Sequence, residues 1–552
     1  MSCAHRGRCH NDAAFAALAG ASPLPASSGR IVRHRLTRGR QLNRALHDVG
    51  EHGCAYFLGK DDCTDDRHTV SFCDRFRLQS PQPSTTSAVR HRREGATMPM
   101  ANPAPEAALA QQIATLRYDD LPAPVVTVAT QCLLDVLGVT IAGASEPTVA
   151  RLRDTLWATG IAPGKATVVG DGRRTRATEA ALLNGTAGHA LDFDDVAGAI
   201  SAHPSVAVFP AVLALAEECS ASGRALLTAF VAGYETEVRV GLALGTSHYA
   251  RGFHTTATVG ALGAAAAAAH LLELDAAHTA TALGIAATQT GGLKGMFGTD
   301  CKPFHAGRAS SAGVLAAQLA AGGFTATPGF LSHPQTMGDA LSEEPDSAQL
   351  TVPFADRWHV PDTLFKAHAA CYLTHGAIEA ALALRSIVAP ADVDRIEVRV
   401  PPGHLAACNI LDPQTRLQAK FSLRFVTAAA LSTGRTDEST FDDARLWDDR
   451  LRLLAARVDV VPDSTVAPYA AVLTATTRDG GRHRLSRDTG RPRWTRDPAE
   501  QQDLLVTKFR ALVEPVFGPV ETERLLDALA DLPRLARATD LLPQAGHSAP
   551  TP

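Results

Sequence analysis

A mainly α-helical fold is predicted for this chain, with a large helical domain followed by a smaller α+β domain. Segments rich in Ala and Gly, with apolar residues at helical spacing, follow one another from about residue 104 to 330. Alternation of the β type first appears after about residue 362. The sequence has no βαβ alternation and no GxGxxG after a strand, which excludes a Rossmann fold.

Residues 1–97 differ from the rest and are predicted to be a disordered or non-native N-terminal extension. They are rich in Arg, His and polar residues and show no sustained helical or strand period. Up to about residue 47 the segment is Arg-rich and nearly free of acids, which weakly resembles a transit peptide. An over-extended gene start is the alternative, because helical patterning begins only after Met98 and Met100. We therefore expect a cytoplasmic protein, with mitochondria as the alternative location.

The helical domain is expected to span residues 98–362. The stretch "APVVTVATQCLLDVLGVTIAGA" has apolar residues at helical spacing, and "HPSVAVFPAVLALAEECSASG" opens with Pro in its first turn. The apolar run 255–272 is built from small residues, so it predicts a buried helix and not a membrane span.

An α+β domain is expected over residues 363–490. In "VDRIEVRVPPG" the alternation places Ile396, Val398 and Val400 on one face of a strand. Further on, "AAVLTATTRDGGRHRLSRDTG" predicts a hairpin that turns at Asp479-Gly480, and "LQAKFSLRFVTAAALSTG" predicts a short helix between the two. Amphipathic helices over 491–545 are then expected to return to the helical domain.

Composition excludes several classes of function. The chain has 552 residues, a net charge of −4 and no basic excess, so neither nucleic acid nor a membrane is expected as a partner. Its ten cysteines are scattered without a CxxC pair, which argues against a zinc site or a disulfide framework. A Walker loop and a GxSxG motif are also missing, so no cofactor and no metal are predicted.

Two stretches carry histidines at the starts of helices. "NGTAGHALDFDDVAGAISAHPS" brings His189, Asp194 and Asp195 close to His203, which precedes a helix-initiating Pro. Its acids predict either a cation site or helix capping, and the two alternatives have about even weight. In "RGFHTTATVGALG", His254 stands before an apolar helix, where a cap is more common than a catalyst.

Two more stretches carry lysines within apolar surroundings. "TDCKPFHAGRASS" holds Lys302, His305 and Arg308, and "LFKAHAACYLTHGAIEAALAL" holds Lys366 at the junction of the two domains. A buried lysine needs a partner, and a small anionic substrate would supply one. Cationic groups beside acid–base histidines suit a small polycarboxylate, because they stabilise the charge that forms when a neighbouring C–H proton is removed.

Taken together, the motifs resemble the MmgE/PrpD family, which includes 2-methylcitrate dehydratase, cis-aconitate decarboxylase and iminodisuccinate epimerase. The matching stretches are "LLDVLGVTIAGA", "ALLNGTAGHALDFDD", "HPS", "GYE", "FHTTATVG", "GLKGMFGTDCKPFHAGRAS", "FKAHAACYLTH" and "AKFSLRF", in this order over roughly residues 105–510. The resemblance implies a metal-independent homodimeric enzyme, in which the α+β domain acts as a lid over a cleft.

The resemblance also implies the roles of individual residues. The expected catalytic residues are Asp192, His203, His254 and Lys302, and the expected substrate-binding residues are Lys366, Tyr372, His375 and His305. The decarboxylases carry a histidine where this chain has Cys371, and a tyrosine that they carry after the strand "RIEVRVP" is replaced by His404 and Leu405.

Three classes of function follow. The first is a lyase, above all a dehydratase of a small di- or tricarboxylate such as 2-methylcitrate or citrate, with a cis-aconitate-type decarboxylase as the alternative. The second is an epimerase of an imino- or aminodicarboxylate, which needs a similar pocket. The third is a non-catalytic homologue, against which the retained histidines and lysines argue.

Overall fold

The computed structural model describes residues 24–28, 31–35, 104–327, 329–495 and 497–542, which belong to two separate units, 1–79 and 80–552. In the first unit, β1 (Leu24–Ser28) and β2 (Ile31–Arg35) form an antiparallel hairpin. The sequence analysis found no strand period there, because five-residue strands are too short to show one. The prediction of a disordered or non-native extension over the rest of 1–97 lies outside the described residues.

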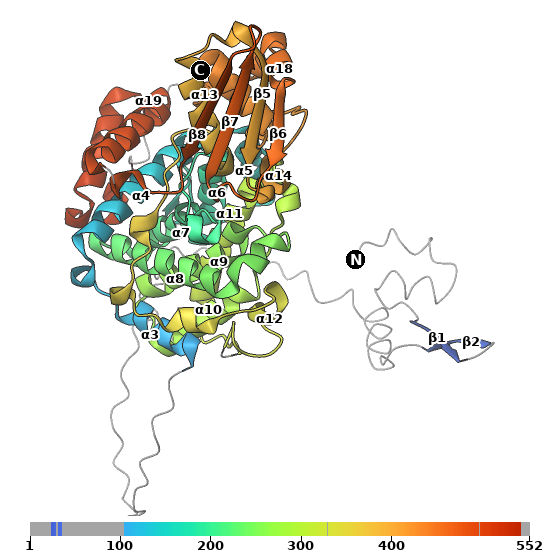
Figure 1. Cartoon of the computed structure of the whole chain (residues 1–552). Helices are drawn as coiled ribbons and strands as arrows, with labels where there is room; N and C mark the ends of the chain where they lie inside the picture. Colours follow the sequence, from blue (N-terminus) through green and yellow to red (C-terminus); the bar gives the residue numbers. More distant parts are fainter. Residues whose placement is uncertain (1–23, 29–30, 36–103, 328, 496, 543–552) are drawn as a thin grey trace, which may run out of the picture. The chain divides into compact units, whose positions relative to one another are not determined.

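The second unit begins with a layered group of helices that surrounds one core (Figure 1). Its helices are α3 (Pro105–Thr115), α4 (Ala123–Gly143), α5 (Pro147–Ala158), α6 (Ala177–Ala190), α7 (Pro204–Cys219), α8 (Gly223–Ala250), α9 (Thr255–Leu271), α10 (Ala276–Ala287), α11 (Cys301–Ala321) and α12 (Met337–Leu341). The expectation of an all-helical domain needs one correction, since β3 (Ala166–Thr167) and β4 (Arg174–Thr175) form a small antiparallel pair.

Small residues allow these helices to approach closely. A Cβ added to Gly307 of α11 would lie 2.1 Å from the carbonyl oxygen of Leu182 of α6, so α6 and α11 touch backbone to backbone. Helix α9 is buried along almost its whole length, as its run of small residues predicted. Helix α4 is long and apolar enough to cross a membrane, but 78% of its apolar window is buried inside the fold, as in the core helices of many proteins.

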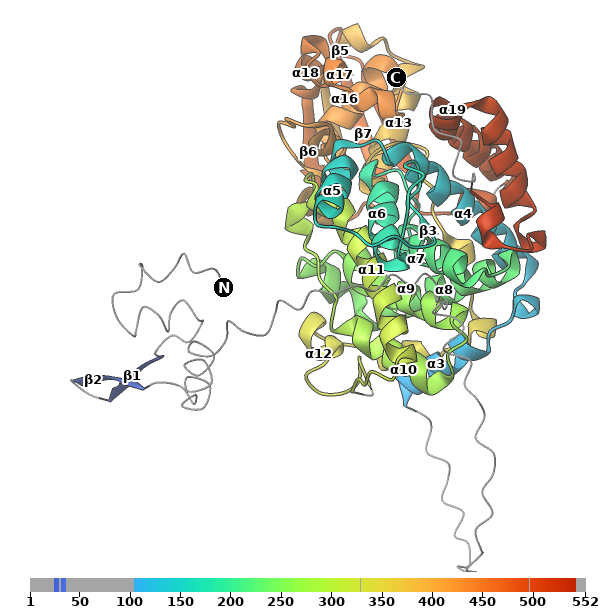
Figure 2. The ribbon, with the colours of Figure 1, turned by 180° about the vertical axis from the view of Figure 1, so that it is seen from behind.

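A four-stranded sheet follows, in the strand order β6-β5-β7-β8 (Figures 1 and 2). Strands β5 (Val393–Val400) and β6 (Val458–Pro462) are parallel, and β7 (Ala470–Thr477) and β8 (Arg482–Asp488) continue the sheet antiparallel. The buried face of β5 carries Ile396, Val398 and Val400, and β7 and β8 join at Asp479-Gly480, so both predictions are confirmed.

Helices cover one face of this sheet, as the view from behind shows (Figure 2). Those labelled there are α13 (His375–Arg385), α16 (Leu423–Thr433), α17 (Asp443–Leu446) and α18 (Asp449–Ala455), while the short helices α14 (Pro402–Cys408) and α15 (Arg416–Ala419) lie in the chain between β5 and α16. Among them α15 and α16 confirm the short helical stretch that was predicted between the strands.

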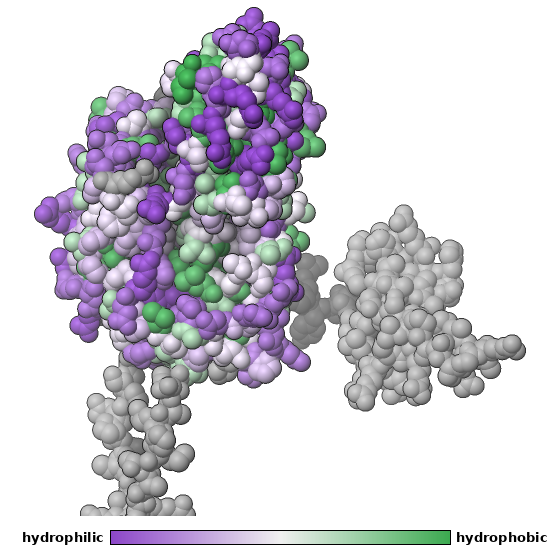
Figure 3. Space-filling model, viewed as in Figure 1, coloured by the Kyte–Doolittle hydropathy of each residue, from purple (hydrophilic) through white to green (hydrophobic). Residues whose placement is uncertain are grey.

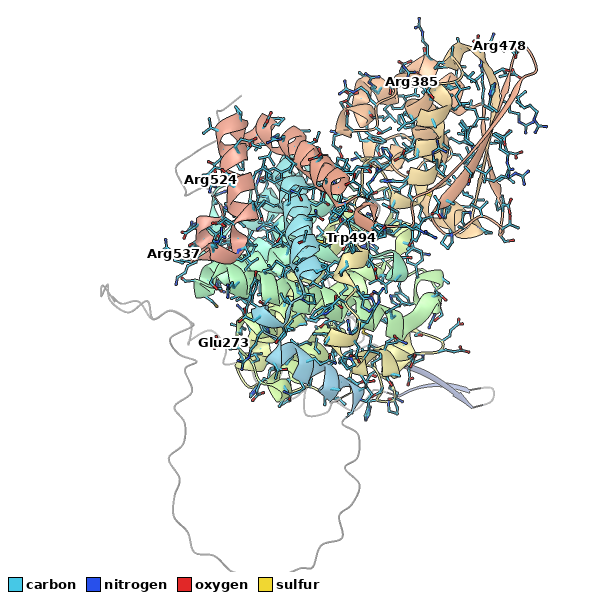
Figure 4. The ribbon with its side chains drawn as sticks, turned by 60° about the vertical axis from the view of Figure 1, so that its left-hand side comes forward. Glu273, Arg385, Arg478, Trp494, Arg524 and Arg537 are labelled. Atoms are coloured by element: carbon cyan, nitrogen blue, oxygen red, sulfur yellow. The ribbon has the colours of Figure 1, made fainter. Side chains whose placement is uncertain are left out.

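The chain then returns to the helical part. Trp494 lies where the segment after β8 crosses back, and its indole N–H donates to the carbonyl oxygen of Pro361 (Figure 4). Helix α19 (Pro498–Ala530) packs along α4 and is kinked at Gly518, whose φ of 76° lies in the left-handed region. This return brings a lysine of α19 to the loop between α6 and α7.

Candidate active site

A small cavity forms where four segments of the second unit meet. These segments are the loop from α6 to α7, the N-terminal ends of α9 and α11, and residues 363–373, which pair with the loop through Val196 and Leu364. The cavity measures about 50 Å³, and its wall includes the charged or titratable residues Asp192, His203, Tyr249, His254, Lys302, Cys371, Tyr372 and Tyr469. All four expected catalytic residues therefore line one space.

Lys302 connects two groups that flank the cavity. From the first turn of α11, its Nζ donates to Asp192 Oδ1 at 3.0 Å and to His189 Nε2 at 2.7 Å. An ammonium group has three N–H donors, so one remains for a ligand in the cavity. Burial lowers the pKa of Lys302, although the Asp192 carboxylate opposes that shift. A substrate carboxylate was predicted as the partner of Lys302, and the structure adds Asp192 as a partner from the protein itself.

His189 is held in a single neutral tautomer. Its Nδ1 lies 2.9 Å from the carboxylate of Asp194, and its Nε2 faces the ammonium of Lys302. A carboxylate only accepts and an ammonium only donates, so the proton sits on Nδ1. Burial lowers the pKa of His189 to about 3, despite the opposing charge of Asp194. The sequence pattern did not reveal this link, because Asp194 fitted a cation site or a cap equally well.

His203 precedes Pro204, which begins α7, and is oriented by the loop before it. Its Nδ1 lies 2.8 Å from the carbonyl oxygen of Asp195 and 3.3 Å from Asp194 Oδ2. Because both oxygens only accept, Nδ1 carries the hydrogen, and the lone pair lies on Nε2. Burial lowers the pKa of His203, with Asp194 acting in the opposite direction. A neutral imidazole with a fixed free nitrogen is suited to act as a base.

His254, at the start of α9, has a different partner. Its Nδ1 lies 3.1 Å from Nδ1 of His305, so one ring donates and the other accepts. Burial, reinforced by Lys302, lowers the pKa of His305 to about 4 and holds that of His254 well below its usual range. His305 lies behind His254 and is not in the cavity wall, which corrects its expected role in binding substrate.

Asp192 has an unusual backbone and one free oxygen. Its φ of 49° places it in the left-handed region, which costs a non-glycine residue energy and is concentrated at functional sites. Oδ1 accepts from Lys302 and Lys366, but Oδ2 is buried and has no partner among the described residues. Burial raises the pKa of Asp192, but the two ammonium groups outweigh burial and hold the pKa below its usual range.

Three lysines hold the backbone on which Asp192 stands. Consecutive carbonyl oxygens each accept from an ammonium: Leu191 from Lys420 at 2.5 Å, Asp192 from Lys366 at 2.6 Å, and Phe193 from Lys508 at 2.5 Å. These residues, Lys366, Lys420 and Lys508, are called the lysine cradle below. They come from the domain junction, from the end of α15 and from α19, so three distant parts of the chain fix one strained loop.

Each member of the lysine cradle is compensated by acids. Lys420 pairs with Glu438 at 2.7 Å, and Lys508 pairs with Asp135 of α4 at 2.6 Å. Lys366 is fully buried, donates twice to Asp192, and does not line the cavity. Its expected contact with a substrate carboxylate is therefore corrected to support of the Asp192 loop.

Of the two remaining expected binding residues, Tyr372 lines the cavity and His375 does not. The ring of Tyr372 lines the cavity, while its hydroxyl donates to the carbonyl oxygen of Thr489 at 2.7 Å. His375 begins α13, is buried, and donates toward the carbonyl oxygens of His368 and Ala370. It does not line the cavity, since the ring of Tyr372, at 4.6 Å between centroids, lies against it.

A metal site was tested on the same residues. Within the described ranges, His189, Asp194 and His203 bring ligand atoms within 4.8 Å of one another. These atoms already form the hydrogen bonds that set both tautomers, at 2.9 Å for His189. A metal ion at this point would have to replace those bonds, so the donor set fits proton chemistry better than a metal centre.

Comparison with known proteins agrees with this architecture. Residues 107–350 match the MmgE/PrpD N-terminal domain, and residues 368–533 match the MmgE/PrpD C-terminal domain. The chain belongs to the MmgE/PrpD family. Each of the two MmgE/PrpD domains contributes to the cavity wall, the N-terminal one with His203 and the C-terminal one with Cys371.

Curated relatives within the MmgE/PrpD family are named as lyases. The chain is 30% identical to the cis-aconitate decarboxylase of Homo sapiens over 372 aligned residues. This alignment covers 64% of this chain and 76% of the human protein. The cis-aconitate decarboxylase of Aspergillus terreus is 24% identical over 458 residues, covering 77% of this chain and 93% of that protein. This similarity supports an enzyme of the lyase class.

Proposed function

We propose that this chain is a lyase that removes water from a small di- or tricarboxylate. The observation that carries the proposal is the Asp192 carboxylate, whose Oδ2 is buried without a partner among the described residues, in a cavity wall shared with Lys302, which keeps one N–H spare, and with His203, whose Nε2 carries the lone pair. A substrate carboxylate pairs with the ammonium. The unpartnered carboxylate oxygen needs a hydrogen-bond donor, and a substrate hydroxyl is one.

The proton steps follow from these positions. His203 Nε2 takes the proton from the carbon beside the carboxylate, and Lys302 stabilises the enediolate-like charge that results. The electron pair of the enediolate then forms the C=C bond while the C–O bond breaks, and the C–O pair leaves with the hydroxide, which takes a proton from Lys302 and departs as water. Burial, which lowers the pKa of Lys302, makes that proton transfer easier. Exchange with solvent restores both side chains.

Decarboxylation of a cis-aconitate-like acid is the second candidate, and the names of the relatives favour it. There the bond to the departing CO2 supplies the electrons for a new double bond, and the old double bond takes up a proton. Such a substrate has no hydroxyl for Asp192 Oδ2. An epimerase would use a base on each face of the carbon, one to remove the proton and one to return a proton to the opposite face, and a non-catalytic homologue would do neither.

The deciding experiment is a proton NMR assay of the full chain in deuterated buffer with citrate, 2-methylcitrate, cis-aconitate and iminodicarboxylates. Loss of water from a hydroxy acid, abolished in Lys302→Met, is the expected result. Release of CO2 would move the assignment to a decarboxylase, and deuterium exchange without net conversion would move it to an epimerase. Arg385→Met, at the C-terminal end of α13 and outside the cavity wall (Figure 4), serves as the control for loss of one positive charge.

A further inference from the structure

A second cavity lies directly behind Tyr372. It measures about 190 Å³ and is formed by α13, the end of β8 and residues 489–493. Its polar lining includes Tyr372, His375, Glu379, Arg487, Arg491 and Arg493. We call it the arginine cavity. Of the site residues expected from the sequence, only Tyr372 and His375 line the arginine cavity.

The charges around the arginine cavity leave a positive excess. Glu379 is occupied, because its Oε1 lies 3.0 Å from Arg493 and 3.3 Å from His368. Within the described ranges, no carboxylate lies within 4.0 Å of the guanidinium of Arg487 or Arg491. Asp488 is the other acid of the wall, and its Oδ1 accepts from the N–H of Gly490. The three arginines of the wall face two carboxylates, so one positive charge is left over. Arg487 donates one N–H to the carbonyl oxygen of Ser486, and the remaining N–H donors of the exposed Arg487 and Arg491 match a carboxylate.

A thin apolar partition separates the arginine cavity from the catalytic cavity. Val196, Leu364 and Tyr372 form a small cluster apart from the main core, with Tyr469 packed against it. Tyr372 lines both cavities; its ring packs against His375 and Tyr469, and its hydroxyl makes one hydrogen bond, to the carbonyl oxygen of Thr489. The catalytic cavity, at about 50 Å³, is far smaller than ligand cavities of roughly 300–1,000 Å³. Moving the Tyr372 ring would join the two spaces.

We propose that the arginine cavity is a second carboxylate-binding site, in which Arg487 and Arg491 hold the polycarboxylate beside the catalytic cavity before Tyr372 admits it. This inference rests on the proposed function for the identity of the anion. The sheet-bearing part carries many hydrophilic residues with apolar ones among them (Figure 3). Binding there raises the local concentration of an anion in a protein whose net charge is −4.

The kinetic test uses the double variant Arg487→Gln/Arg491→Gln of the full chain. KM for the substrate is expected to rise about tenfold or more, because two charge-assisted contacts are lost, while kcat stays within about twofold. The matched control is Arg478→Gln/Arg482→Gln on the same hairpin, which removes the same charge outside the cavity; Figure 4 shows Arg478 at its far end. An equal rise of KM in both double variants would mean that the arginines attract the anionic substrate only through their overall charge. That result would overturn the inference.

A binding test works even if turnover is never found. Calorimetric titration of citrate is expected to show two sites in the unaltered chain, one in Arg487→Gln/Arg491→Gln, and the arginine site alone in Lys302→Met. Citrate binding that is the same in the unaltered chain and the double arginine variant would overturn the inference, whatever the reaction is. If citrate binding depends on the arginines but the double arginine variant alters kcat and not KM, the arginine cavity is an effector site. That result would also overturn the proposed passage past Tyr372.

Discussion

The N-terminal ends of α7 and α9 look alike in sequence and differ in chemistry. His203 and His254 both stand immediately before an apolar helix, and both lie in the wall of one cavity. The Nδ1 of His203 faces a backbone carbonyl, so its tautomer is fixed by the main chain. The Nδ1 of His254 faces another histidine, so its tautomer depends on His305. A fixed ring suits a base, and an adjustable ring suits a group that accepts in one step and donates in the next.

The largest effect is expected at the fixed ring. His203→Gln removes the basic Nε2 and should lower kcat about 10³-fold, in the range of general-base catalysis. The measurement is kcat on the substrate found by NMR. His270→Gln is the matched control, because His270 also donates Nδ1 to a carbonyl, that of Ile113, away from the cavity. A loss in His203→Gln no larger than in the control would mean that His203 is not the base.

The lysine cradle should come next. Lys508→Met releases the carbonyl oxygen of Phe193 and should lower kcat about 10- to 100-fold, as loss of a supporting contact does. Since the change leaves Asp135 buried without its partner, Lys508→Met/Asp135→Leu restores a neutral core. We expect this double variant to melt near the temperature of the unaltered chain and still to have a low kcat. Full recovery of kcat would show that Lys508 acts on stability alone.

The pH profile tests the neutral state of His203. Protonation at Nε2 would remove its lone pair, so activity falls as pH falls through the pKa of this ring. Burial lowers that pKa, and the acid limb of kcat/KM should therefore lie below the ordinary histidine value of about 6.5. The profile of kcat/KM in constant ionic strength buffer measures it. An acid limb at or above pH 6.5 would contradict the assignment of His203 as the base.

The smallest effect is expected at the partner of the adjustable ring. His305→Gln keeps a hydrogen-bonding side chain near His254 but ends the exchange between two imidazoles, so we expect kcat to fall about threefold to tenfold. His305→Phe removes the partner altogether and should cost more. If both variants keep full activity, the tautomer of His254 does not matter and the difference between the two helix starts has no catalytic meaning.

Local patterns predicted the fold, and the family resemblance indicated the residues that line the cavity. The alternation around Ile396, the turn at Asp479-Gly480 and the His-Pro start of α7 each depend on neighbours within a few residues. The lysine cradle could not be predicted this way, since Lys420 and Lys508 lie 229 and 315 residues from the carbonyls that they hold. In the sequence both lysines fit helical segments, where a charged residue normally marks a solvated face. Only tertiary packing shows that they are buried.

The close contact between α6 and α11 limits which part of the cavity wall can be mutated to alter the choice of substrate. Gly185 precedes His189 by one turn, and the Cβ that it lacks would lie 2.7 Å from the Cα of Gly307, five residues after Lys302. A larger residue at Gly185 or Gly307 would therefore push apart the two helices that carry the Lys302–His189 pair. Tyr372, Leu373 and Tyr469 form a part of the cavity wall that these two helices do not supply. A laboratory search for variants with new substrates should randomise that part of the wall and leave Gly185 and Gly307 unchanged.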